Sequence, residues 1–316
     1  MKNLTTNQAA ELLKSKDNIL ILTHRRPDGD TSGCAAALCR GLRSLGKTAS
    51  ILENPQLIEK YRPYHEGLTV SQVPQGAYLV SVDVASQDML CLGAQQLCVD
   101  LLVDHHGSNP GFASQGIIRP ESAACGEIIL DLLQAMDVKL DKAMAEAAYV
   151  AISTDTGCFR YSNTTANTLA AAAVCLEAGA DVYPINKALF ETVRLSRLKL
   201  NAYMAQHLEM LAEGRIALCP IPLEVEKETG VLEDDMEDVS NFARNIEGVE
   251  LAVTFRTVEN GDTKLSIRSS PMYDAAALAV AMGGGGHKAA AGATVHGDYA
   301  TARQRTLELM HQQGIL

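Results

Sequence analysis

Short, continuous hydrophobic runs alternate with longer helical patterns through the first half of the chain. Runs of this kind, without alternating polar positions, are typical of parallel strands that are covered on both faces. We expect strands within residues 18–24, 47–53, 77–86 and 98–106. Helices are predicted within residues 31–46, 124–137, 141–155 and 165–180, the first of them signalled by Asp30 and Thr31. The alternation predicts an α/β fold with a doubly wound, mostly parallel sheet.

The pattern changes near Ser196, which indicates a second body. We expect a helix over 196–214, a strand over 215–221, an acidic helix start at 233–246 and a hairpin over 249–270 with Asn260-Gly261 in its turn. A glycine run then separates two helical stretches within 275–295, and a final helix begins near Tyr299. The predicted domains are residues 1–190 and a smaller α/β domain over 214–316, joined by a helical linker at 191–213.

Length and charge limit the classes of function. A chain of 316 residues is long enough for two domains with separate cores. It has no apolar run as long as a membrane span, and residues 1–18 are too polar for a secretory signal, so we expect a cytoplasmic protein with no membrane contact. A net charge of −11 argues against binding a long duplex, and is compatible with a short anionic substrate. The eight cysteines form no C-x-x-C pair, so a zinc ribbon is not expected.

Histidines and aspartates lie at or just past the ends of the predicted strands. His24, Asp83 and Asp104 occupy such positions. Because the carboxyl ends of parallel strands meet at one edge of a sheet, the fold would bring these side chains together. Neighbouring positions add Asp28, Asp30, His105 and His106, and Asp155 follows a helical pattern. A single aspartate after a strand is usually a turn or cap residue, so the prediction of a site depends on the whole set.

This set of side chains is suited to divalent cations. Carboxylates and imidazoles without a thiolate favour Mn²⁺, Fe²⁺ or Mg²⁺, and are also compatible with Zn²⁺ or Co²⁺. Two such ions roughly 3.5–4 Å apart would form a clamp for in-line displacement at phosphorus. Two divalent ions would also balance the four negative charges of Asp28, Asp30, Asp83 and Asp155. Without metal these carboxylates would repel one another and take up protons.

The histidines and aspartates of this set lie in four sequence segments, and a fifth segment follows near the end of the chain. In order, the five are THRRPDGDTSG, SVDVAS, LLVDHHGSNPGF, STDTGCFRYSNTT and GGGGHKAAAGA, and together they extend over nearly the whole chain. Together they resemble the DHH phosphoesterase superfamily with a C-terminal DHHA1 domain. Within it, the chain is similar to the small bacterial oligoribonucleases that are also pAp phosphatases (nanoRNases). RecJ exonucleases share both domains but usually carry further DNA-binding modules, and family II pyrophosphatases have a different second domain.

The resemblance implies a role for each residue of the set. His24, Asp28 and Asp83 would hold a first metal ion. A second ion would be held by Asp30, Asp83, His105 and Asp155, and Mn²⁺ is favoured for both positions. Asp104 would orient a neighbouring histidine, and His106 would face the reacting phosphate. Arg26 and Cys34 stand where relatives often have Asn and Ser, and neither change removes a proposed ligand.

The glycine run of the second domain has two interpretations. Glycine runs are usually flexible breaks, but backbone N–H groups at the start of a helix also form phosphate cradles. The resemblance favours the cradle. It implies that the substrate phosphate is bound by this run together with an arginine on a nearby strand, which gives the set Arg268, Ser269, Gly284, Gly285, Gly286 and His287.

The resemblance implies a metal-dependent phosphohydrolase that degrades RNA fragments of about two to five nucleotides to mononucleotides. Removal of the 3′-phosphate of 3′-phosphoadenosine 5′-phosphate (pAp) is the expected second activity. An active-site cleft between the domains would limit substrate length. The alternatives are a phosphodiesterase for cyclic dinucleotides or linear pApA, a short-range DNA exonuclease and a non-catalytic nucleotide sensor. The protein is expected to be a monomer or a homodimer.

Overall fold

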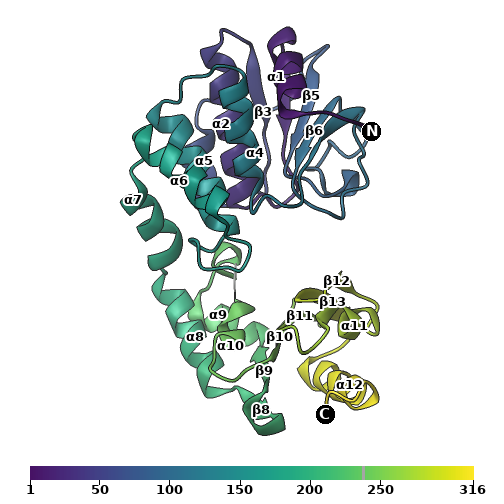
Figure 1. The fold of residues 1–316 in the computed structure, drawn as a ribbon. Coiled ribbons are helices and arrows are strands. Elements are labelled where there is room, and N and C mark those ends of the chain that lie inside the picture. Colours follow the sequence, from purple (N-terminus) through teal and green to yellow (C-terminus); the bar gives the residue numbers. More distant parts are fainter. Residues whose placement is uncertain (237–238) are drawn as a thin grey trace. The chain divides into compact units, whose positions relative to one another are not determined.

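The computed structural model describes residues 1–236 and 239–316. The chain divides into two compact units, Met1–Thr192 and Val193–Leu316, drawn in purple to teal and in green to yellow in Figure 1. Most of the segment expected to link two domains, 191–213, therefore belongs to the second unit. Among the described residues, no helix combines the length and the hydrophobicity needed to span a membrane.

The first unit is built on a seven-stranded sheet with the order β1-β7-β6-β5-β2-β3-β4, in which every neighbouring pair is parallel. The strands are β1 (Lys2–Asn3), β2 (Ile19–Leu22), β3 (Ala49–Leu52), β4 (Thr69–Val70), β5 (Tyr78–Val82), β6 (Leu101–Asp104) and β7 (Gln115–Ile118). The four strands expected from the hydrophobic runs are confirmed as β2, β3, β5 and β6. The pattern does not reveal β1 and β4, because two residues are too few to show a period.

Seven α-helices accompany this sheet in the described part of the first unit. They are α1 (Thr6–Ser15), α2 (Gly29–Ser44), α3 (Arg62–His65), α4 (Cys125–Ala135), α5 (Lys142–Asp155), α6 (Ala166–Glu177) and α7 (Val182–Asn186). The four predicted helices are confirmed as α2, α4, α5 and α6. The start of α2 differs from the prediction, because Asp28 caps the helix by accepting the backbone N–H of Thr31 at 3.1 Å. Asp30 is thereby left free for another role.

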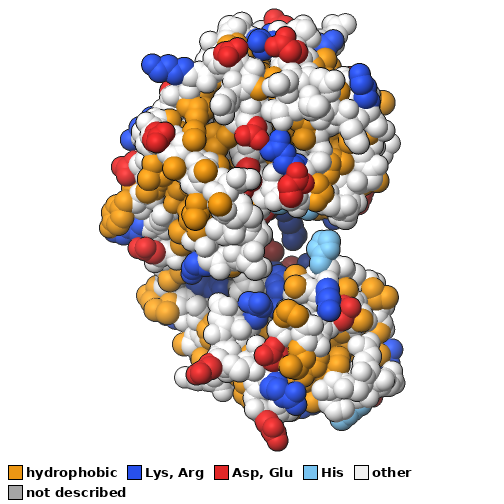
Figure 2. Space-filling model, in the orientation of Figure 1, with side chains coloured by type: hydrophobic (Ala, Val, Ile, Leu, Met, Phe, Trp, Pro, Cys, Tyr) orange, Lys and Arg blue, Asp and Glu red, His pale blue; other side chains and the backbone are white. Residues whose placement is uncertain are grey.

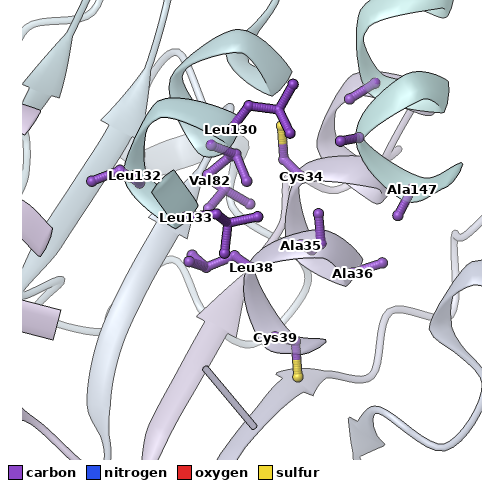
Figure 3. Close-up of a cluster of buried hydrophobic side chains, with 14 of the residues drawn as sticks. Cys34, Ala35, Ala36, Leu38, Cys39, Val82, Leu130, Leu132, Leu133 and Ala147 are labelled. Atoms are coloured by element: carbon purple, nitrogen blue, oxygen red, sulfur yellow. The ribbon is translucent and has the colours of Figure 1, made fainter. Parts of the chain in front are cut away.

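One face of the sheet is covered by helices. In Figure 3, Cys34, Ala35 and Leu38 of α2 pack among side chains of α4 and α5. The contact between α2 and α5 is close, since a Cβ atom on Gly33 would lie 2.3 Å from the backbone oxygen of Ala147. Small residues therefore let these two helices approach, and the approach brings the N-terminus of α2 near the C-terminus of α5.

The opposite face has a different cover. Leu20, Leu22 and Leu102 point into a separate core, where they meet Leu90 and Val99 from the chain between β5 and β6. The described residues packed there belong to strands, loops and one 3₁₀ turn, and not to α-helices. The parallel sheet with both faces covered is thus confirmed, and helices provide the cover on one face only. A hydrophobic loop buries the same apolar strand faces as a helix would.

The second unit contains a six-stranded mixed sheet with the order β12-β13-β11-β10-β9-β8. Its strands are β8 (Glu209–Leu211), β9 (Ile216–Ile221), β10 (Leu251–Thr257), β11 (Thr263–Ser269), β12 (Gly285–His287) and β13 (Ala290–Val295). Its α-helices among the described residues are α8 (Leu195–Gln206), α9 (Leu223–Thr229), α10 (Asn241–Arg244), α11 (Ala275–Val280) and α12 (Tyr299–Gln312). Short 3₁₀ turns occur in the chain at Glu59–Tyr61, Gln87–Met89, Ala212–Gly214 and Glu233–Met236, and a π-helical turn at Lys187–Glu191.

Three predictions for this unit need correction. The helix expected over 196–214 ends at Gln206, and β8 follows it. The helix expected over 233–246 is a 3₁₀ turn followed by the short α10, and residues 237–238 within it lie outside the described residues. The second helical stretch expected after the glycine run is strand β13, in which buried Ala291 and Ala293 alternate with exposed residues. Pairing with β11 overrides the helix propensity of alanine. The hairpin of β10 and β11 and the final helix are confirmed.

Candidate metal centre

The predicted site residues of the first unit lie at the carboxyl edge of its sheet. The central strands β6, β5 and β2 are neighbours in that order. His24 follows the end of β2, Asp83 follows β5 directly, and Asp104 is the last residue of β6. The chain runs outward from β2 through β3 on one side and from β5 through β6 on the other. This reversal of strand order is where α/β sheets bind ligands.

The side chains at this edge form overlapping groups of possible metal ligands. Within each group the ligand atoms lie within 4.8 Å of one another. The groups are His24, Asp28 and Asp83; Asp30, His105 and Asp155; and Asp83, His105 and His106. The structure thus brings together all six residues expected to bind metal, and Asp83 stands between the first group and the others.

Asp83 has an unusual backbone conformation and an incomplete set of hydrogen bonds. Its backbone has a φ of +55°, a left-handed conformation that aspartate tolerates better than most residues. The hydroxyl of Thr31 donates to Oδ2 at 2.6 Å, whereas Oδ1 is buried and has no hydrogen-bond partner. A buried carboxylate oxygen without a partner is costly, and a cation beside it would remove that cost. This orphaned oxygen shows that the residues present fit a metal ion.

The ring of His105 is oriented for ligation. Its Nδ1 lies 3.1 Å from the backbone oxygen of Ser122, which can only accept, so Nδ1 carries the hydrogen. In the neutral ring this places the lone pair on Nε2. This Nε2 lies 3.5 Å from Oδ1 of Asp83 and 3.4 Å from Oδ2 of Asp155. Such a carbonyl contact is the usual way in which a protein fixes the tautomer of a ligating histidine.

Asp30 is fixed by the start of α4. Its Oδ2 accepts the backbone N–H of Cys125 at 2.6 Å, and its Oδ1 accepts that of Gly126 at 3.0 Å. The thiol of Cys34 donates to Oδ1 as well, at 3.2 Å. The N-terminus of a helix favours a negative charge at this position. Cys34, one of the departures noted in the sequence, thus supports the carboxylate without competing for a cation.

The carboxylates raise one another's proton affinity. Burial, with the charges of Asp83 and Asp155, raises the pKa of Asp30 well above its usual value. Burial and the charges of Asp83 and Asp28 raise the pKa of Asp155 to about 7. The expectation that clustered carboxylates would take up protons without metal agrees with the directions for Asp30, Asp83 and Asp155, whereas the hydrogen bond and charge of His24 outweigh burial and lower the pKa of Asp28. A divalent cation would reverse the upward shifts, because its positive charge stabilises the ionised forms.

At the other end of the site, His24 and Asp28 form a pair. Nε2 of His24 lies 3.7 Å from Oδ1 of Asp28. Burial lowers the pKa of His24, but the neighbouring Asp28 outweighs it and the pKa stands above its usual value. Asp28 therefore serves twice, as the cap of α2 and as a potential ligand. Arg26, the other departure, is exposed two residues away.

Asp104 and His106 form a unit behind the potential ligands. Oδ1 of Asp104 accepts from Nδ1 of His106 at 2.8 Å and from the backbone N–H of His105 at 2.8 Å, and Oδ2 accepts from the Asn109 amide at 2.5 Å. Both oxygens of this buried carboxylate are used, so it orients His106. The hydrogen bond to Asp104 raises the pKa of His106 to about 9. This shift favours the protonated ring, in which Nε2 is the second donor.

The sequence pattern does not single out three residues that hold this site. Asn109 supports Asp104, Thr31 holds Asp83, and Asn163 donates to the backbone oxygens of Ala123 and Asp155 at 3.1 Å each. All three lie inside the segments that carry the resemblance. Each of the three is a polar residue close in sequence to a predicted metal ligand, and this proximity was the feature from which a supporting role could have been predicted.

In the second unit, the glycine run does not begin a helix. It follows α11 and enters the edge strand β12, so the predicted cradle at a helix N-terminus is corrected. Gly284 and Gly286 pass close to β13: a Cβ atom would lie 2.1 Å from the Gly292 oxygen in the first case and 2.5 Å from Cα of Ala291 in the second. Gly285 has open space around it. The run is exposed and offers backbone groups along the sheet edge.

Arg268 and His287 share one face of this sheet. Ala290 pairs with Arg268 of β11 on one side and with His287 of β12 on the other. Side chains in one cross-strand row point to the same face, so the guanidinium of Arg268 and the imidazole of His287 flank a small alanine. Ser269 is different, because its buried hydroxyl donates to the backbone oxygen of Lys288 at 2.7 Å. It fastens the hairpin turn to β11.

Comparisons with known proteins support this architecture. The model of the DHH family, N-terminal domain, matches residues 18–152, and that of the DHHA1 domain matches residues 221–313. A protein of Thermus thermophilus named bifunctional oligoribonuclease and PAP phosphatase NrnA is 34% identical, over 96% of this chain and 93% of its own. A crystal structure of an exopolyphosphatase-related protein from Bacteroides fragilis has a TM-score of 0.88 at 22% identity, covering 97% of this chain and 95% of that one. Exonuclease RecJ bound to manganese has a TM-score of 0.55 at 16% identity, with coverage of 97% and 94%.

Proposed function

We propose that this chain, which belongs to the DHH family and carries a DHHA1 domain, hydrolyses short oligoribonucleotides to mononucleotides and removes the 3′-phosphate of pAp. The observation that carries the proposal is the orphaned Oδ1 of Asp83, buried where two groups of potential metal ligands meet. A relative with 34% identity over almost its full length is named for both activities. The enzyme class that follows is a hydrolase of phosphate esters.

The proposed cofactor is a pair of divalent cations, with Mn²⁺ favoured and Mg²⁺, Co²⁺, Fe²⁺ or Zn²⁺ compatible with the same ligands. One would be held by His24, Asp28 and Asp83. The other would be held by Asp30, Asp83, His105 and Asp155. When bound, such ions supply Lewis acidity and lower the pKa of a water that attacks phosphorus.

The protein's own contribution to the reaction is made mainly by His106. Its protonated ring donates through Nε2 to a phosphate oxygen and stabilises the negative charge that develops there. The same proton can be passed to the leaving oxygen. Asp104 holds the ring through Nδ1 and does not exchange protons with the substrate, since its buried oxygens are occupied by three donors.

The second unit is proposed to bind the substrate's other phosphate. Arg268 and His287 lie in one row of the sheet and offer a guanidinium and an imidazole to an anion. The backbone of Gly284, Gly285 and Gly286 would approach the same phosphate without obstruction from side chains. Ser269 would act by holding the turn that carries Lys288.

A substrate panel tests the proposal. Purified protein with Mn²⁺ is incubated with RNAs of two to five nucleotides, pAp, pApA, a cyclic dinucleotide and a long single-stranded DNA. We expect the short RNAs and pAp to be consumed fastest, and a chelator to stop both reactions. Faster turnover of the cyclic dinucleotide or pApA would favour the alternative phosphodiesterase, and comparable turnover of the long strand would contradict the preference for short substrates.

The same panel separates an enzyme from a nucleotide sensor. Asp83→Ala removes the carboxylate shared by the proposed metal sites. An enzyme should lose turnover of pAp with this change, whereas a sensor would show no turnover in either protein. Binding of pAp is measured in parallel by calorimetry, so that loss of turnover is not confused with loss of the substrate site.

A further inference from the structure

A polar residue outside the set of potential ligands lies beside His24 at the edge of the first sheet. Strands β2 and β3 are parallel, with Ile21 opposite Ile51. Three positions further along both segments, the same register places Asn54 opposite His24. Because the residue before a proline favours an extended backbone, Asn54, which precedes Pro55, continues the direction of β3. The first group of potential ligands therefore has an asparagine next to its histidine.

The side chain of Asn54 is buried, with 6% of its surface exposed, and its amide makes three hydrogen bonds. Nδ2 donates to the backbone oxygen of His24 at 2.8 Å and to Oγ1 of Thr23 at 3.1 Å, and Oδ1 accepts the backbone N–H of Gln56 at 3.0 Å. These partners define the orientation of the amide, because the His24 oxygen can only accept and the Gln56 N–H can only donate. An aspartate here would set a carboxylate oxygen against the His24 carbonyl.

The main chain around His24 is also held by the chain between β5 and β6. His24 forms an antiparallel bridge with Leu90, and the backbone N–H of Arg25 donates to the backbone oxygen of Met89 at 2.8 Å. The carbonyl of His24 is the group that Asn54 binds. Among these contacts, that of Asn54 is the one made by a side chain, so a substitution can remove it while the backbone contacts of the loop are retained.

The two histidines among the potential ligands are oriented in different ways. The ring of His105 is held directly, since its Nδ1 lies 3.1 Å from the backbone oxygen of Ser122. In the part of the chain that the structure describes, the ring of His24 has no such bond to a carbonyl, and Oδ1 of Asp28, itself a potential ligand, lies 3.7 Å from its Nε2. The position of the His24 ring consequently depends on the main chain that carries it, and Asn54 fixes this main chain.

We propose that Asn54 is a positioning residue for the first of the two proposed cations. It does not bind the cation and acts through the main chain of His24, whose imidazole it keeps beside Asp28 and Asp83. This inference rests on the proposed function, because it concerns the cation expected at these three residues. Loss of a group that orients a metal ligand lowers metal affinity by about 10- to 100-fold. Asn54 should therefore set the affinity of the first site and have little effect on the second, which contains His105.

Calorimetric titration of the metal-free full chain with Mn²⁺ tests the proposal. We expect two binding events in the wild type. In Asn54→Ala, the dissociation constant of one event should rise by about tenfold or more, while that of the other changes little. Asn54→Leu retains the volume of the side chain without its amide and should give the same result. Agreement of the two variants assigns the effect to the lost donor and not to a cavity.

The titration has its own controls. Asn7→Ala makes the same chemical change at an exposed position of α1 and should retain both affinities. Thermal unfolding followed by circular dichroism verifies that each variant is folded. On the face of the molecule drawn in Figure 2, acidic side chains are interspersed with basic ones, so no extended acidic surface there competes for Mn²⁺.

A double-mutant cycle identifies the site through which Asn54 acts. In a His24→Ala background the first site has already lost its histidine, so Asn54→Ala should cause no further loss of Mn²⁺ affinity. In a His105→Ala background, Asn54→Ala should retain its full effect. Equal weakening of both sites by Asn54→Ala, or effects that add to those of His24→Ala, would make Asn54 a general support of the sheet edge and overturn the proposal.

Failure of this inference can be distinguished from failure of the proposed function. A wild-type protein that bound no Mn²⁺ would contradict both. Two wild-type binding events that remain unchanged in Asn54→Ala and Asn54→Leu would overturn the role of Asn54 alone, and the proposed metal centre would stand.

Discussion

Asp104 holds His106 by a hydrogen bond of 2.8 Å between Oδ1 and Nδ1, and this bond raises the pKa of the ring to about 9, which favours the protonated form with Nε2 as its second donor. The aspartate is fully buried and Asn109 fixes its other oxygen. Although Asp104 belongs to the same sequence motif as His105, it lies in none of the groups of potential metal ligands found among the described residues. Adjacent residues of one motif thus have separate functions.

This relationship predicts the effect of Asp104→Asn. The amide removes the negative charge that keeps His106 protonated, while the potential metal ligands are unchanged. We expect kcat for pAp to fall by about 10²-fold or more, with little change in bound metal. Kinetics and elemental analysis of the same sample measure both quantities. Asn109→Ala should shift kcat in the same direction by a smaller factor, and an unchanged kcat in Asp104→Asn would contradict the role given to the pair.

Metal binding should stabilise the fold. Because Asp30 and Asp83 are buried and repel each other without metal, the cation adds binding energy to the native state alone. At a metal concentration of 100 times Kd the gain is about 2.7 kcal/mol. Thermal unfolding of dialysed protein with and without Mn²⁺ measures it. Asp83→Ala should abolish the rise in Tm, while the exposed control Asp88→Ala should retain it; equal shifts in both variants would contradict a site at Asp83.

The close contact of α2 and α5 predicts that Gly33→Ala is destabilising. The added methyl group would lie 2.3 Å from the Ala147 oxygen, which is backbone and cannot rotate away. Overpacking of this kind costs about 1–3 kcal/mol, and we expect the upper end of that range. Urea unfolding followed by circular dichroism measures the change. Gly285→Ala, where no atom lies within 4 Å of the new methyl group, is the control and should unfold at nearly the wild-type midpoint.

The proposed substrate contact predicts a binding defect in Arg268→Ala. Loss of a charged hydrogen bond to phosphate costs about 1.5–3 kcal/mol, so KM for pAp should rise by at least roughly tenfold. The chemistry belongs to the first unit, and kcat should change much less. Lys264→Ala removes a cation on the same strand, about 13 Å along it, and is the matched control. If the two variants had the same KM, Arg268 would have no special role.

Much of the first unit could be predicted from the sequence, because its strands and site residues are indicated by short stretches of consecutive residues. The strands β2, β5 and β6 are continuous hydrophobic runs, and His24, Asp83 and Asp104 follow from where those runs end. Parallel strands then place the residues at one edge. The helical cover was less predictable, since the face around Leu20 and Leu102 is buried by a loop whose sequence has no regular period.

The second unit shows where local information fails. The alanines of β13 favour a helix, and only pairing with β11 and β12 makes this segment a strand. The role of the glycine run changes with it, from a helix start to an exposed sheet edge. Ser269, expected to contact substrate, has its hydroxyl buried against Lys288 of the turn. None of these contacts is visible in the spacing of residues.

The sequence by itself determined the kinds of side chain at the site and the strand ends that carry them, because hydrophobic runs and motifs are local features of the sequence. Only the tertiary structure decided which side chain could bind a metal ion and which one orients another residue. Asp30 accepts N–H groups from residues 95 and 96 positions away, one oxygen of Asp83 is left without a donor, and Asp104 accepts from His105, His106 and Asn109. Hydrogen bonds between distant segments form only when the chain has folded, and they set how each carboxylate is held at the site.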